Sequence, residues 1–177
     1  MLARLFRKKS IKTAARRLYD QLSLAAREPA LYGFGKVADT PDGRFELLAL
    51  HAGVLFTRLS KRGEQADETS QEVFDILFSA MDHALRELGV GDISVGKRIR
   101  KLAESFYGRL AVYHDGIAMA QSDREPLTQS IATHVLDNAS NNNSYAQYLA
   151  DRVVAWTDDL SNFDDATLLA GDLPLPK

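Results

Sequence analysis

The sequence predicts an all-α fold, a single-domain bundle of about six to seven helices. Apolar residues recur at intervals of three and four along most of the chain, which is the period of an amphipathic helix. No run of alternating β-branched residues competes with them. The 177 residues are about one domain in length, and 45% of them are hydrophobic, enough for a core.

The first helix is expected to follow Ser10 as its N-cap and to end before Pro29. Its apolar positions recur at helical spacing: Ile11, Ala15, Leu18, Leu22 and Ala25. Residues 31–43 are rich in glycine and proline, and we expect them to form an ordered connection. A second helix should begin at Phe45 and end near Gly63.

The third helix is predicted to start at Thr69, because Glu72 three residues later completes a capping box. It should end at Gly89, where a left-handed residue is usual. Its apolar stripe comprises Val73, Phe74, Leu77, Phe78, Met81, Leu85 and Leu88. Of the histidines before and on this helix, His51 should pack on the apolar stripe of the second helix and His83 should face solvent.

A fourth helix should run from Val95 to Leu110, with cations on the face away from its apolar stripe: Lys97, Arg98, Arg100 and Lys101. Positive charge near a helix N-terminus is opposed by the helix dipole, so these cations do not serve helix stability. Pro126 opens a shorter helix, and the tract 138–144 is expected to be a loop. Tyr145 to Trp156 forms another helix, and residues 163–169 add a last turn.

We expect three segments: a basic amphipathic helix at 1–30, a helical domain at 31–170 and a short tail at 171–177. The net charge is −2, so specific nucleic-acid binding is not expected. The start of the chain is nevertheless strongly basic, which predicts weak contact with an anionic membrane surface. The cations expected to make it are Arg4, Arg7, Lys8, Lys9, Lys12, Arg16 and Arg17. Solvated charge without a partner is the open alternative.

No secretory signal is expected, and the longest apolar stretch, Leu47 to Phe56, is about half the roughly 20 residues that span a bilayer. Because the chain contains no cysteine, disulfides and thiolate chemistry are excluded.

Two motifs could suggest an enzyme. Gly91 to Lys97 has the G-x-x-x-x-G-K spacing, but Arg98 stands where a P-loop needs Ser or Thr. His114-Asp115 could join an upstream histidine and Asp151 in a helical metal-dependent phosphohydrolase, which we keep as an alternative. A peripheral lipid-binding protein is a second alternative. The residues favour neither catalysis nor a metal or cofactor site.

Two longer strings carry a resemblance to a known family. Residues 32–45 read YGFGKVADTPDGRF, and residues 81–98 read MDHALRELGVGDISVGKR, followed by FYGR at 106–109. Together they resemble the ubiquinol-cytochrome c chaperone family, from Leu31 to the final helix. The resemblance implies a helical, non-enzymatic assembly factor of respiratory complex III that binds newly made cytochrome b or its nascent chain.

The same resemblance implies where the protein works. The length of the chain suits a bacterial, cytoplasmic member at the inner face of the plasma membrane, and ribosome contact is left open. We expect the partner-binding residues to be Asp42, Arg44, Gly91, Asp92, Lys97, Arg98, Tyr107 and Arg109. For each of them a local role is an open alternative: Asp92 or Ser94 could cap a helix, and Arg44 could pair with a carboxylate.

Overall fold

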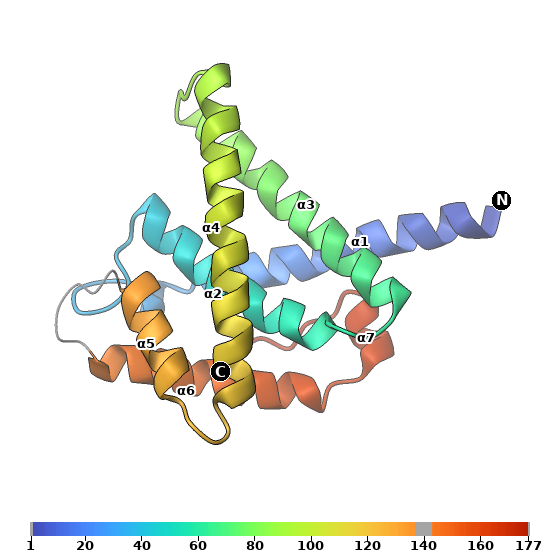
Figure 1. Ribbon diagram of the computed structural model, residues 1–177. Helices are drawn as coiled ribbons and strands as arrows, with labels where there is room; N and C mark the ends of the chain where they lie inside the picture. The colour runs from blue at the N-terminus through green and yellow to red at the C-terminus, as the bar shows by residue number, and fades with distance from the viewer. Residues whose placement is uncertain (1, 137–142, 177) are drawn as a thin grey trace. The chain divides into compact units, whose positions relative to one another are not determined.

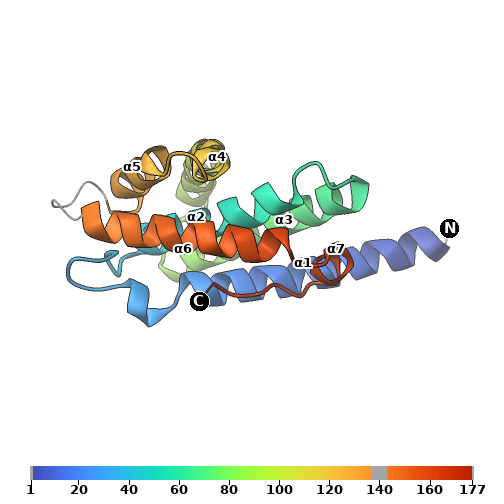
Figure 2. The ribbon, with the colours of Figure 1, turned by 90° about the horizontal axis from the view of Figure 1, so that it is seen from below.

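A computed structural model describes residues 2–136 and 143–176, and side chains within 6–92, 94–136 and 144–176. These residues form seven α-helices, one short 3-10 helix and connecting turns, without a named strand (Figures 1 and 2). The elements are α1 (Leu2–Ala26), η1 (Pro29–Leu31), α2 (Pro41–Leu59), α3 (Glu64–Glu87), α4 (Asp92–Met119), α5 (Glu125–His134), α6 (Asn143–Ser161) and α7 (Asp165–Leu169). The predicted all-α fold is therefore confirmed.

The helices divide into two compact units, each built from separate stretches of the chain. The first unit comprises Met1–Asp20, Leu59–Gly108 and Asp164–Asp172. The second comprises Gln21–Arg58, Arg109–Phe163 and Leu173–Lys177. Both have their own buried apolar side chains, so each is described by itself below.

The first unit packs α1 beside α3 and α7. Ile11 and Leu18 on α1 are buried, as are Leu77 on α3 and Leu168 on α7. After α7 the chain approaches α1 so closely that a Cβ on Gly171 would lie 2.9 Å from the Cα of Ala14. Glycine is required there for both space and its φ of +97°.

The second unit packs α2 against the last part of α4, and α5 lies beside α6. Gly53 of α2 allows the close approach of Tyr113, whose Cβ lies 3.2 Å from the Cβ position of Gly53. Trp156 of α6 is buried, and its indole Nε1 donates to the carbonyl of Pro174 at 2.6 Å. The C-terminal segment is thereby fastened along α6.

Two predicted helix starts are wrong. Helix α1 begins at Leu2, so Ser10 lies inside the helix and not at its N-cap. Helix α3 begins at Glu64, and Thr69 donates from its hydroxyl to the Gln65 carbonyl within the helix at 2.7 Å. For α3 the reason is that a polar turn, Glu64–Glu68, precedes the apolar stripe.

Two other helices differ from their predicted length. Helix α2 begins at Pro41 and ends at Leu59, earlier at both ends than expected. Helix α4 continues nine residues past Leu110, to Met119. The predicted left-handed Gly89 is confirmed with a φ of +78°, and the expected loop at 138–144 lies mostly outside the described residues. His51 is buried and His83 is exposed, as predicted.

The apolar stripe of α3 is only partly buried. Val73, Leu77 and Phe78 are in the core, but Met81 and Leu85 are half-buried and Leu88 is 70% exposed. The far end of α3 thus carries a helical apolar pattern with no core behind it. No described helix is long and apolar enough to cross a membrane.

Candidate functional site

An aromatic cluster joins α3 to α4 within the first unit. The Phe74 ring stacks on Tyr107 with centroids 5.1 Å apart and lies 4.5 Å from the Phe78 ring. Phe106 meets Phe78 edge-on at 5.5 Å and is fully buried. Tyr107 is 56% exposed, so the cluster is core on one side and open to solvent on the other.

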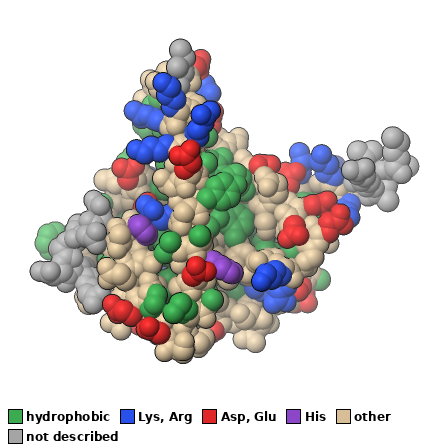
Figure 3. Space-filling model, viewed as in Figure 1, with side chains coloured by type: hydrophobic (Ala, Val, Ile, Leu, Met, Phe, Trp, Pro, Cys, Tyr) green, Lys and Arg blue, Asp and Glu red, His purple; other side chains and the backbone are tan. Residues whose placement is uncertain are grey.

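The first turns of α4 carry a strongly basic face. Its side chains Lys97, Arg98, Arg100 and Lys101 are all exposed, and in the described part of the chain none has an ion-pair or hydrogen-bond partner. Figure 3 shows Lys and Arg side chains gathered over the start of α4, with hydrophobic side chains beside the helix further along. Because the helix dipole opposes cations at this end, the charge is not explained by the helix itself.

The turn between α3 and α4 is held by one arginine. Arg86 pairs with Asp82 at 2.6 Å and also with Asp92 at the start of α4. Arg86 lowers the pKa of the Asp82 carboxyl by hydrogen bonding to it. Between residues 79 and 94, none of the described side chains is buried. This end of the helical hairpin is therefore fixed by charge pairing, with Leu88 exposed at its turn.

Five of the eight predicted partner-binding residues come together in this first unit: Gly91, Asp92, Lys97, Arg98 and Tyr107. Of the other three, Asp42 is exposed on the first turn of α2. Arg44 pairs with Asp39 at 2.7 Å, which lowers the pKa of that carboxyl. Arg109 donates to both carboxylate oxygens of Glu46, at 2.9 and 3.0 Å. The local pairing kept open for Arg44 is thus present, and Arg109 has one too.

We refer to the aromatic cluster, the basic face of α4 and the α3–α4 turn together as the hairpin surface. It combines exposed cations with exposed and half-buried apolar side chains in the described part of the first unit. Its chemistry suits binding of an apolar segment flanked by negative charge.

The cations of α1 are mostly satisfied within the first unit. Arg7 pairs with Glu64 and Glu68, each at 3.0 Å, and Lys12 lies 4.0 Å from Glu72. Arg16 and Arg17 also have carboxylate partners on Asp20 and Asp172. Lys8 and Lys9 are exposed, and the side chain of Arg4 lies outside the described ones. The apolar face of α1, which includes Ile11 and Leu18, is buried in the core. Helix α1 is therefore part of the core, and much of its charge is neutralised by ion pairs.

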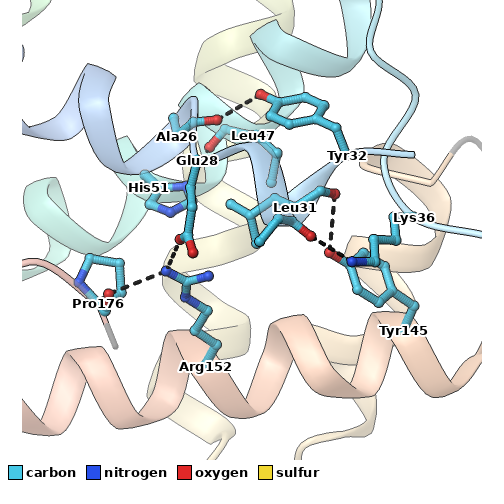
Figure 4. A network of polar contacts seen from close by, with 11 residues as sticks. Ala26, Glu28, Leu31, Tyr32, Lys36, Leu47, His51, Tyr145, Arg152 and Pro176 are labelled. Atoms are coloured by element: carbon cyan, nitrogen blue, oxygen red, sulfur yellow. Dashed lines mark hydrogen bonds and ion pairs between the residues drawn. The ribbon is translucent and has the colours of Figure 1, made fainter. Parts of the chain in front are cut away.

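Sequence reasoning missed a polar network in the second unit (Figure 4). The Arg152 side chain is 9% exposed and pairs with Glu28 while donating to the Pro176 carbonyl at 3.2 Å. The Tyr145 hydroxyl donates to the Leu31 carbonyl at 3.0 Å. These residues come from distant parts of the chain, so no local spacing signals them. The network fixes η1 and the C-terminal segment on α6.

The two motifs considered for an enzyme lie on α4 and the turn before it. Residues 92–97 of the G-x-x-x-x-G-K string already lie in α4 and do not form a phosphate-binding loop. The Nδ1 of His114 lies 3.2 Å from the Thr57 hydroxyl. Among the residues described, no group of three or more His, Asp or Glu side chains is placed to hold a metal ion.

Comparison with known proteins agrees with the fold and with the two sequence strings that resemble the family. A search of curated proteins gave no match. The chain is similar to the Cbp3 homolog from Brucella abortus, a crystal structure, with a TM-score of 0.85 and 34% sequence identity, over 100% of this chain and 97% of that chain. A family model described as ubiquinol-cytochrome C chaperone matches residues 35–175, most of the sequence. The chain belongs to the ubiquinol-cytochrome c chaperone family.

Proposed function

We propose that this protein is a non-enzymatic chaperone that binds newly made cytochrome b during assembly of the ubiquinol-cytochrome c reductase complex. Family membership supports the general role. The observation that carries the assignment to a surface is the set of four exposed, unpartnered cations on α4 beside the open edge of an aromatic cluster.

The hairpin surface has two kinds of contact to offer such a client. Tyr107 and the half-buried Met81 and Leu85 present apolar area that another polypeptide can cover. The unpartnered cations add attraction for carboxylates or lipid phosphates next to that area. Each cation held near an anionic surface contributes about 1 kcal/mol. Both contacts need only a surface, in keeping with a protein that holds its client and makes no bond.

We further propose that the protein works in the bacterial cytoplasm, peripheral to the inner face of the plasma membrane. A client that is a membrane protein enters the bilayer there. The hairpin surface is better suited than α1 to a weak contact with anionic lipid, because its exposed α4 cations have no carboxylate partner among the described residues. Contact with the ribosome would depend on the same α4 cations, which can attract RNA phosphates.

The test is capture of cytochrome b by the charge-reversed variant K97E/R98E. Both side chains are exposed, so the fold should be unchanged. Reversing two cations should weaken capture at least about tenfold, since 1.4 kcal/mol is one decade in affinity. The matched control is K8E/K9E, which makes the same charge change on α1. Equal capture by wild type and K97E/R98E would reject the assignment of the surface, and no capture by wild type would reject the function.

A further inference from the structure

A tight turn in the second unit presents one aromatic ring to solvent. Phe34 is fully exposed, between Gly33 and Gly35, whose φ angles are +127° and +71°. These left-handed angles are ones that glycine adopts without strain, and they place the phenyl ring at the tip of the turn. An apolar ring so completely outside the core has no role in stabilising the fold.

The turn is rigid although its tip is free. The backbone N–H of Gly33 donates to the Val37 carbonyl at 3.1 Å, and the N–H of Val37 donates to the Leu31 carbonyl at 3.2 Å. The hydroxyl of Tyr32 donates to the Ala26 carbonyl at 2.6 Å. The Lys36 ammonium donates to the Ala30 carbonyl at 2.7 Å (Figure 4). The turn is thus ordered before binding, which lowers the entropy lost when a partner covers the ring.

More aromatic surface lies next to the turn. The Tyr145 hydroxyl is bonded to the Leu31 carbonyl, three residues before Phe34, and the Tyr145 ring stacks on Tyr148 at 5.4 Å. Tyr148 is 49% exposed. The carboxylate of Asp39, five residues after Phe34, pairs with Arg44 at 2.7 Å. Tyr145 and Tyr148 thus add aromatic area near the turn that carries Phe34.

We propose that Phe34 is an anchor that inserts between side chains of an apolar transmembrane helix of the client. This inference rests on the proposed function and adds a contact in the second unit to it. A single ring fits the hole formed by four side chains on a helix surface. A transmembrane helix is apolar all round, so it offers such holes on every face. Direct insertion of the turn into lipid is disfavoured, because even one myristoyl chain binds membranes only marginally.

The first measurement compares cytochrome b capture by the full-length chain and its F34A variant. Burying a Phe side chain contributes about 1.5–3 kcal/mol, so F34A should weaken capture roughly ten- to one-hundredfold. F34L should restore most of it, because an apolar side chain of similar size remains. The control is L24A, which removes another exposed apolar side chain from the same unit and should leave capture unchanged.

The second measurement places a photo-crosslinking amino acid at position 34. A crosslink to a transmembrane segment of cytochrome b supports the proposal. Crosslinks only to lipid or to a different protein overturn the assigned occupant. Capture that is equal for wild type and F34A overturns the anchor while leaving the proposed function intact. If wild type captures no cytochrome b, the proposed function fails and the anchor with it.

Discussion

Burial of His51 in the second unit predicts a loss of stability at mildly acidic pH. The side chain lies inside the unit with its ring 5.6 Å from Trp156. Its Nδ1 donates to the Leu47 carbonyl at 2.7 Å, which fixes the neutral tautomer. Desolvation is the largest influence and lowers the pKa of His51 from 6.5 to about 4. The positive charge of Arg152 lowers this pKa further, and Glu28 raises it.

The sign and size follow from proton linkage. The unfolded chain binds a proton at His51 more readily than the folded chain, so folding is favoured above pH 6.5. That stability is lost as the pH falls from 6.5 toward about 4. One pKa unit corresponds to 1.36 kcal/mol, so the full effect is about 3 kcal/mol. Between about pH 7.5 and about pH 5, the free energy of unfolding should fall by about 2 kcal/mol.

Urea unfolding of wild type and H51N at these two pH values measures the effect. The Asn amide can still donate to the Leu47 carbonyl but does not titrate, so H51N should lose about 2 kcal/mol less than wild type over this interval. The control H83N removes an exposed imidazole and should behave as wild type. Carboxyls whose pKa is lowered, such as that of Asp82, stay ionised at pH 5, so their titration does not contribute to the pH dependence of either variant over this interval. An equal pH dependence in wild type and H51N would refute this reasoning.

Two more predictions concern buried charge and the membrane. E28A should lower the free energy of unfolding by about 3 kcal/mol, because it removes the carboxylate that pairs with the largely buried Arg152 side chain. R152M should have a smaller effect, because Glu28 is partly exposed and its charge can be hydrated. Urea unfolding measures both, and a larger loss for R152M would contradict the argument. In flotation with anionic liposomes, K97E/R98E should bind less than wild type, whereas the control K8E/K9E should bind as wild type does. If K8E/K9E binds less and K97E/R98E binds normally, the lipid contact belongs to α1.

The client-binding surface was predicted only in part from sequence. The cations of α4 could be identified because they lie off an apolar stripe and against the helix dipole. The cations of α1 have the same local pattern, yet Arg7, Lys12 and Arg17 face carboxylates of α3 and the segment after α7. Sequence spacing distinguishes a basic face but not its partners, because those partners are up to 155 residues away.

Phe34 was part of a string that suggested the family, but nothing local separated an exposed ring from a core ring. Its position outside the core depends on backbone bonds from Gly33 and Val37 and on Tyr145 of another helix. The ion pair of Arg152 and Glu28 could not be predicted from sequence for the same reason.

The helical class follows from the sequence alone, because a 3.6-residue apolar period needs only local geometry to be recognised. The two extended strings also indicate the family. Which part of each apolar stripe is covered depends instead on how the helices pack. Leu77 and Leu88 occupy similar positions on the α3 stripe, but Leu77 is buried and Leu88 is 70% exposed, because neighbouring helices cover one end of α3 and leave the other open. Burial and charge pairing are properties of the whole packed chain, and they select the surface that is left for a partner.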